Sequence, residues 1–226
     1  DWMLEHQHPF LFLTNNATRT RAENVAHMEK LGYRGIKPSH FFTSAMASAA
    51  YVAKQSHKRR AYVIGMAGLE EALLEQGFEL VQDQADYVFV GLDKTADYRR
   101  YSDALKQLLA GAKLIGTNPD RLIATSQGFD IGNGSIVNMF EYASSQTSPR
   151  IGKPYAPILD LALEQLQLHR EDVVLIGDNL ETDIRLGTDN GVETIFVTSG
   201  VHKREDVQRL GVFPDHVVDD LRELIG

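Results

Sequence analysis

The sequence predicts an α/β fold with a doubly wound, mostly parallel sheet. Short apolar runs alternate with segments of helical periodicity along most of the 226 residues. The run at 173–176 is apolar at every position, which is typical of a parallel strand covered by helices on both faces, so we expect a central strand there. Polar side chains follow several such runs, and ligands of these sheets bind at the carboxyl ends of the strands. The fold class therefore also predicts where a functional site lies.

The polar stretch after residues 173–176 is the most informative one. Asp178 and Asn179 follow the strand almost directly, and Asp183 lies about one helical turn further on. Carboxylates at a strand end and at the start of the next helix can approach one cation, and oxygen ligands suit Mg²⁺. A turn residue and a helix cap would explain the isolated pair equally well. The polar residues at two other strand ends favour the cation site over these structural roles.

Thr14 ends the first of these strands, after the apolar run 10–13, and Asn15 and Asn16 follow it. A hydroxyl group and the backbone N–H groups of a turn form a neutral cradle that suits phosphate oxygens. The spacing of residues 20–23 predicts a capping box at the start of the next helix.

Lys153 is expected at the end of a short strand, with Pro154 in the first turn of the following helix. A lone lysine at such a position is usually solvated, but here three strand ends carry matching chemistry. Asp178 would hold Mg²⁺, Lys153 would neutralise crowded negative charge, and Thr14 would bind a phosphate oxygen. This combination indicates phosphoryl transfer, although the sequence offers no evident nucleophile.

Three motifs resemble, in order and spacing, motifs II, III and IV of the haloacid dehalogenase (HAD) superfamily. They are Leu-Thr-Asn-Asn at 13–16, Ile-Gly-Lys-Pro at 151–154 and Gly-Asp-Asn-Leu-Glu-Thr-Asp at 177–183. The likeness is to the class IIA phosphatases, the NagD and p-nitrophenyl phosphatase-like group, and extends to residues 43–47, 116–120, 132–135 and 198–201.

The resemblance implies a Mg²⁺-dependent phosphatase that hydrolyses small phosphorylated metabolites, such as sugar phosphates or 4-nitrophenyl phosphate, through an aspartyl-phosphate. By the same likeness, Thr14 and Asn15 bind phosphate, with Asn16 beside them, and Lys153 orients the nucleophile and the phosphate. Asp178 ligates Mg²⁺. The resemblance further implies that Asn179 and Asp183 support the metal site.

The family's DxDGT motif, which supplies the nucleophile and the general acid, is absent from these residues. Asp1 lies too close to the strand ending at Thr14 to replace it, so we expect that the chain starts late relative to a complete enzyme. A non-catalytic domain that binds Mg²⁺ and a phosphometabolite without turnover stays open as the alternative. A receiver domain is a third possibility, although its Asp, Thr and Lys follow one another in a different order.

A second α/β series begins after Arg60, and the polar stretch 144–149 closes it. The resemblance implies that residues 61–148 form an inserted C2-type cap, and that residues 1–60 and 149–226 form the HAD-like, Rossmannoid core. Residues 118–134 are expected to form a turn-rich loop, and residues 65–68 a tight strand-to-helix turn, because the third glycine of a dinucleotide motif is missing. Three polar residues of this region either line the substrate cavity or cap their own turns: Asn118, Asp120 and Asn133.

Composition limits the remaining classes. The net charge of −8, without a basic stripe, argues against nucleic acid as a partner. No apolar run approaches the roughly 20 residues that cross a bilayer, so we expect no membrane partner. The chain has no cysteine, which excludes disulfides, and its eight histidines form no metal-binding motif. We expect a cytoplasmic protein, and the resemblance adds a homodimer formed through the caps.

Overall fold

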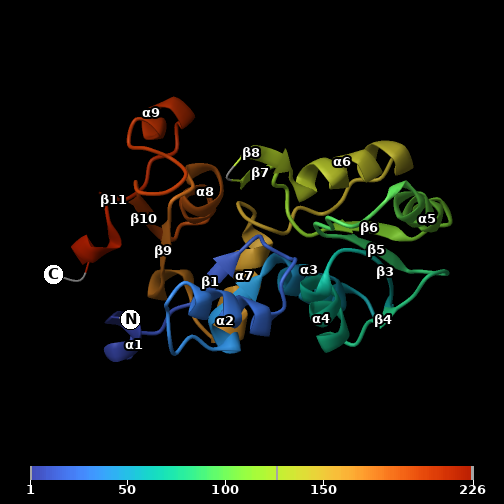
Figure 1. Ribbon diagram of the computed structural model, residues 1–226, viewed down its shortest axis with the longest axis horizontal. Helices are drawn as coiled ribbons and strands as arrows, with labels where there is room; N and C mark the ends of the chain where they lie inside the picture. The colour runs from blue at the N-terminus through green and yellow to red at the C-terminus, as the bar shows by residue number, and fades with distance from the viewer. Residues whose placement is uncertain (1, 126, 225–226) are drawn as a thin grey trace. The chain divides into compact units, whose positions relative to one another are not determined.

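The computed structural model describes residues 2–125 and 127–224 (Figure 1). Asp1, which lies too close to the strand ending at Thr14 to serve as the nucleophile, is outside the described residues. The chain divides into two compact units, residues 3–152 and residues 153–224. We describe each unit by itself.

The first unit begins with a pair of parallel strands. After the short helix α1 (Trp2–Glu5), strand β1 (Phe12–Thr14) pairs with β2 (Phe41–Thr43), and helix α2 (Arg21–Lys30) and the 3₁₀ turn η1 (Pro38–His40) connect them. Thr20 and Glu23 form the predicted capping box of α2. Helix α3 (Ser44–Gln55) follows β2 directly, because the Thr43 hydroxyl caps it by accepting from the Met46 N–H group.

A separate four-stranded sheet occupies the middle of this unit. Its strands are all parallel, in the order β4 (Glu79–Leu80), β3 (Arg60–Ile64), β5 (Tyr87–Val90) and β6 (Lys113–Gly116). Helices α5 (Tyr98–Leu109) and α6 (Asn133–Ser144) pack on the face that carries Val88 and Val90. On the other face, Phe89 contacts Phe78, which follows α4 (Ala67–Glu75). Strand β5 is buried at every position, as its uniformly apolar sequence predicts.

The turn at residues 65–68 connects β3 to α4, as predicted. Gly68 has a packing reason, because a Cβ atom there would lie 2.2 Å from the Arg19 carbonyl oxygen. The Gly68 N–H group donates to the Thr18 carbonyl oxygen at 3.1 Å. This glycine therefore lets the start of α4 approach the loop that follows β1.

The expected loop at 118–134 is wrong in its centre, where two strands form a hairpin. Strand β7 (Leu122–Thr125) pairs antiparallel with β8 (Gly128–Ile131). Apolar and polar residues alternate over Phe129–Ile131 in β8, and Leu122 and Ile131 pair directly and share a face of the hairpin with Phe129. This alternation, which favours a strand, outweighs the turn-forming residues around it.

The second unit contains a parallel sheet in the order β11 (His216–Val218), β10 (Glu193–Val197) and β9 (Val174–Gly177). Its core contains Leu180, Ile184, Phe196 and Val212. The helices and turns of this unit are α7 (Ala156–Leu166), η2 (Arg170–Asp172), the π-helical turn η3 (Leu180–Ile184), α8 (Arg185–Thr188), α9 (Asp206–Leu210) and η4 (Leu221–Leu224).

The expectation that residues 173–176 form a buried central strand is wrong for the described chain. Strand β9 pairs with β10 alone among the described residues and lies at the edge of its sheet. Val174 and Ile176 are consequently 42% and 36% exposed.

The α/β fold class is confirmed, since every strand pair of the described chain except β7–β8 is parallel. Residues 61–148 contain their own sheet and hairpin, but the boundaries of an inserted cap stay a prediction. Within residues 2–125 and 127–224, no helix combines the length and the apolar character that crossing a membrane requires.

Candidate functional site

The loop after β1 is folded by its own polar side chains. Thr14 ends the strand, as predicted, and its Oγ1 accepts a hydrogen bond of 3.1 Å from the Asn16 N–H group. Asn16 Oδ1 in turn accepts from the backbone N–H and the hydroxyl of Thr18, at 2.9 and 2.7 Å. Such local bonds curl the chain at the carboxyl end of the strand. The Thr14 hydroxyl is thereby placed at the edge where a ligand is expected.

Asn15 is buried and connects this loop to the segment after β6. Its carbonyl oxygen accepts from Ser44 Oγ at 2.7 Å and from Asn118 Nδ2 at 2.8 Å, and its Nδ2 donates to Asp120 Oδ1 at 3.1 Å. An ionised carboxylate only accepts, so Asp120 fixes which end of the Asn15 amide faces it. The opposite end, Oδ1, faces Gly152, where a Cβ atom would lie 2.8 Å from it. The structure thus brings three predicted residues together: Asn15, Asn118 and Asp120.

Asn133 lies at the carboxyl end of the four-stranded sheet. Its Nδ2 donates to the Val90 carbonyl oxygen and to Thr117 Oγ1, both at 3.0 Å. Its Oδ1 is buried and accepts no hydrogen bond from the described residues. These contacts give Asn133 a role in joining β5, β6 and the start of α6.

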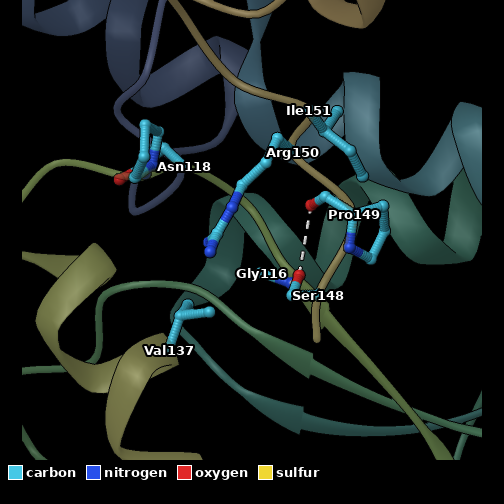
Figure 2. A pocket seen from close by; sticks show the side chains of 8 residues that line it. Gly116, Asn118, Val137, Ser148, Pro149, Arg150 and Ile151 are labelled. Atoms are coloured by element: carbon cyan, nitrogen blue, oxygen red, sulfur yellow. Dashed lines mark hydrogen bonds between the residues drawn. The ribbon is translucent and has the colours of Figure 1, made fainter. Parts of the chain in front are cut away.

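The chain that leaves α6 is anchored at the end of β6, beside a small cavity (Figure 2). Ser148 Oγ accepts from the Gly116 N–H group at 2.7 Å and donates to the Pro149 carbonyl oxygen at 3.2 Å, the bond drawn in Figure 2. The cavity has a volume of about 10 Å³, which is room for about one water molecule. It is too small to hold a phosphate ester.

In the second unit, Asp178 follows β9 directly and is held by the segment 200–202. Its Oδ2 accepts from the Val201 N–H group at 2.8 Å, and its carbonyl oxygen accepts from the His202 N–H group at 3.1 Å. A Cβ atom at Gly200 would lie 1.9 Å from Asp178 Oδ2. The family-like segment 198–201 therefore includes a glycine that makes room for this carboxylate.

Lys153 and Asp183 form an ion pair in the same unit. Lys153 Nζ lies 2.6 Å from Asp183 Oδ1, and Asp183 Oδ2 accepts from the Asn179 N–H group at 3.2 Å. Asn179 Oδ1 accepts from Glu181 N–H at 3.0 Å and caps the π-helical turn. A Cβ atom at Gly177 would lie 2.2 Å from the Asp183 Cβ atom, so the two ends of this loop approach closely. Both Asp183 oxygens are thus engaged within the protein.

The predicted strand at residues 151–153 is wrong. Lys153 lies in a turn, and α7 begins only at Ala156, with Pro157 rather than Pro154 near its first position. Pro154 lacks the N–H group that a strand ladder needs. The turn brings Lys153 to Asp183, a contact that no local pattern predicts.

No motif of the sequence selects His202 as a functional residue. Its Nδ1 accepts from the Leu180 N–H group at 3.1 Å, and its side chain is only 12% exposed. The available signal was its position two residues after Gly200 in the family-like segment.

Asp178 fits the protein side of a magnesium site. Mg²⁺ is usually bound by one or two carboxylates together with water and substrate phosphates. Among the described residues, no group of three His, Cys, Asp or Glu side chains could hold a metal by itself. A site built on Asp178, with Asn179 and Asp183 supporting its loop, would therefore depend on water and substrate for its remaining ligands.

Comparisons with known proteins agree with this geometry. Family models described as haloacid dehalogenase-like hydrolase and HAD-hydrolase-like match residues 1–79 and 150–224. An acid sugar phosphatase of Staphylococcus haemolyticus is 36% identical across 100% of this chain and 86% of its own length, and one of Staphylococcus aureus is 38% identical across 96% and 84%.

Solved structures of similar proteins cover nearly the whole chain. A p-nitrophenyl phosphatase from Archaeoglobus fulgidus has a TM-score of 0.89 at 29% identity, over 99% of this chain and 87% of the other. A 4-nitrophenylphosphatase from Thermotoga maritima has a TM-score of 0.91 at 28% identity, over 98% and 85%.

Proposed function

The chain belongs to the haloacid dehalogenase-like hydrolases, in the class IIA group, and from this premise we propose a Mg²⁺-dependent phosphatase that acts on small phosphorylated metabolites. The membership confirms the family predicted from the three motifs and, with it, the prediction of a phosphatase enzyme. The metal, the substrate and the reaction path are the proposed part.

The observation that carries the proposal is the ion pair between Lys153, in the turn before α7, and Asp183, in the π-helical turn after β9. The two side chains are only 12% and 17% exposed, and the N–H group of Asn179, the residue after Asp178, binds the same Asp183 carboxylate. A fixed cation of this kind neutralises negative charge that grows on phosphate oxygens during transfer. We propose that Asp183 holds Lys153 for this role and that Asp178 provides the carboxylate for Mg²⁺, which would supply further charge neutralisation.

Thr14 and Asn15 are proposed to bind the phosphate group. Thr14 is the last residue of β1. The loop after it is curled by hydrogen bonds within residues 14–18, so that this short segment contains hydroxyl groups and backbone N–H groups. Neutral donors of this kind bind anions without an opposing charge. Asn16 contributes by shaping the turn through its bonds to Thr18.

The proposed substrates are sugar phosphates and 4-nitrophenyl phosphate, because the relatives carry the names acid sugar phosphatase and p-nitrophenyl phosphatase. Residues 61–148, as a C2-type cap, would select the leaving group, with Asn118, Asp120 and Asn133 at the carboxyl edge of their sheet. A homodimer through the caps and a cytoplasmic location complete the proposal.

An aspartate nucleophile belongs to the proposed reaction, and the 226 residues contain no DxDGT motif. The test therefore uses the full-length protein. We expect it to release phosphate from 4-nitrophenyl phosphate and from a panel of sugar phosphates in Mg²⁺, and to stop when EDTA removes the metal.

Two substitutions test the roles of the charged groups. Asp178→Asn and Lys153→Ala should each lower kcat/KM by about 100-fold or more, as expected for groups that stabilise transition-state charge. Asp160→Asn is the matched control, because Asp160 lies in the same unit and is paired with Arg170 in an exposed contact. Absence of phosphate release, or full activity of Asp178→Asn, would refute the proposal.

Binding without turnover is the second candidate, and the missing DxDGT motif is the observation that favours it. Calorimetry with a sugar phosphate and Mg²⁺, followed by analysis of the recovered ester, separates the two functions. A binding domain leaves the ester intact, whereas the full-length enzyme converts it to alcohol and phosphate.

A further inference from the structure

We propose that His202 is a positioning residue for Asp178. Its imidazole ring holds the segment 178–180 in the conformation in which the Asp178 carboxylate is presented to a cation. This inference rests on the proposed function, in which Asp178 binds Mg²⁺.

Three hydrogen bonds join the segment 200–202 to the segment 178–180. Two of them are donated by the backbone N–H groups of Val201 and His202, to the carboxylate and the carbonyl oxygen of Asp178. Almost any residue could supply these two. The third runs from the Leu180 N–H group to His202 Nδ1 at 3.1 Å and requires a side-chain acceptor at position 202.

The hydrogen bond from Leu180 fixes which nitrogen of the imidazole ring is the acceptor. A backbone N–H group can only donate, so Nδ1 must be the accepting nitrogen and the proton of the neutral ring lies on Nε2. Nε2 faces Glu181 Oε2 across 3.8 Å, which is too long for a hydrogen bond. The ring is only 12% exposed, and its defined contact is therefore the one with Leu180.

Leu180 is a rigid point through which His202 can act. Its side chain is fully buried in the core with Ile184, Phe196 and Val212, and it is the first residue of the π-helical turn. The N–H groups at the start of a helical turn have no partner within the turn, so an outside acceptor must satisfy them. Asp178 lies only two residues before this anchored position.

The Asp178 carboxylate has little freedom once the anchor is set. Val201 binds its Oδ2, and Gly200 approaches the same oxygen so closely that no Cβ atom fits. A shift of the segment 178–180 away from 200–202 would therefore change the direction of the carboxylate. The Val201 bond holds this segment at Asp178, and the His202 side chain holds it at its other end, Leu180.

The first test measures Mg²⁺ binding to the full-length protein by calorimetry, with the metal alone and no substrate. His202→Ala should raise the Kd for Mg²⁺ by about 10-fold, at the low end for groups that support a metal ligand. His202→Asn should lie closer to wild type, because its Oδ1 can accept from Leu180. His216→Ala is the control, since His216 is 57% exposed and pairs with Glu193 in the same unit.

The second readout needs no metal. Amide hydrogen exchange at Leu180 should become faster in His202→Ala and return toward the wild-type rate in His202→Asn. Thermal unfolding of each variant establishes that it is folded. If His202→Ala does not fold, His202→Gln takes its place, because it keeps a polar side chain but extends its acceptor beyond the Nδ1 position.

The outcomes separate this inference from the proposed function. Faster exchange at Leu180 with unchanged Mg²⁺ affinity would overturn the inference and leave His202 a structural role. Unchanged exchange would overturn it as well, by showing that the bond does not protect Leu180. If wild type binds no Mg²⁺, or Asp178→Asn binds it equally well, the metal site fails together with the inference.

Discussion

The loops that follow β1 and β9 use opposite chemistry at equivalent positions of the fold. In the loop after β1, neutral donors converge on the Asn15 carbonyl oxygen, and hydroxyl and amide groups form the turns. In the loop after β9, the partners are charged, with Asp178 next to a loop built around the Lys153–Asp183 pair. A neutral loop can accept an anion, whereas a loop with carboxylates can accept a cation.

A shared device accompanies this difference. Each loop is approached by a glycine of another segment, whose missing Cβ atom makes room for a polar side chain: Gly152 for Asn15 Oδ1 and Gly200 for Asp178 Oδ2. The comparison teaches that the residue types of a loop determine whether it binds an anion or a cation. The close approach of a glycine backbone to a polar side chain determines the direction in which that side chain points.

The largest effect is expected from Gly200→Ala. The new Cβ atom would lie 1.9 Å from Asp178 Oδ2, so the carboxylate must move. A displacement of about 1 Å at a reacting centre can lower activity by about 100-fold, and we expect a loss of that order in kcat/KM. The Kd for Mg²⁺ should rise in the same variant.

Gly91→Ala is the matched control for this prediction. A Cβ atom there would lie 3.1 Å from the end of the Leu69 side chain, which can shift, and at the ordinary contact distance of 3.6 Å from Ala17 and Thr117. If Gly200→Ala keeps wild-type activity and Mg²⁺ affinity, the direction of Asp178 does not depend on the glycine, and the parallel between the two loops breaks.

Removing a hydrogen-bonding or ion-pair partner from the loop after β9 should lower the free energy of unfolding of the protein more than removing one from the loop after β1. Asp183→Ala removes the carboxylate that lies 2.6 Å from Lys153 Nζ, and the Lys153 side chain is only 12% exposed. Breaking a fully buried ion pair costs about 3–5 kcal/mol, and the partial exposure here lowers our expectation to about 2–3 kcal/mol. Urea unfolding measures the free energy, and Asp160→Ala, in an exposed pair, should change it by less than about 1 kcal/mol.

Asp120→Ala, which removes the partner that the segment after β6 contributes to the loop after β1, should have a smaller effect. It removes the acceptor of the Asn15 amide and should lower the free energy of unfolding by about 1–2 kcal/mol. Because Asn15 lies next to Thr14, we also expect a higher KM for the phosphate ester with a smaller change in kcat. Asp120→Asn keeps an acceptor and should recover most of the loss. Equal losses in the two loops would contradict the distinction between them.

The sequence predicted which polar residues follow β1 and β9, but not the backbone at residues 151–153. Thr14 and Asp178 were placed correctly, because uniformly apolar runs followed by polar residues mark strand ends. Lys153 was assigned to a strand that does not exist, since a three-residue run before proline does not distinguish a strand from a turn. Which residues approach one another across more than a hundred positions, as Asn15 and Asp120 do, is decided by tertiary packing that no local pattern records.

His202 was missed for the same reason. A histidine outside a metal-binding motif carries no local signal, and its contact with Leu180 spans 22 positions. The hairpin at residues 122–131 differs from the expected loop for another reason, because its strands lie within a segment rich in turn-forming residues. Strand β5 is as short as these strands, but its uniformly apolar sequence carries a clear strand signal.

The smallest effect concerns a carboxylate at the opposite edge of the second unit's sheet. Asp215 Oδ2 accepts from the backbone N–H and the hydroxyl of Thr194, both at 2.8 Å, near the amino ends of β10 and β11. Asp215 is a carboxylate whose hydrogen-bond donors are neutral, and it lies where the strands have their amino ends, an edge where no ligand is expected. Asp215→Asn should therefore lower the Tm modestly and leave kcat, KM and Mg²⁺ affinity unchanged.

The pH dependence of this effect follows from the same contacts. The hydrogen bonds from the Thr194 hydroxyl and backbone N–H group lower the pKa of Asp215 below its ordinary value of 3.8. The unfolded chain therefore binds the proton more readily, so the contribution of Asp215 to stability is fully present above about pH 3.8 and is lost as the pH falls through the folded-state pKa. The Tm difference between wild type and Asp215→Asn should shrink over that acidic range. A loss of phosphatase activity in this variant at neutral pH would contradict the prediction, because it would show that function is not confined to the edge where the strands have their carboxyl ends.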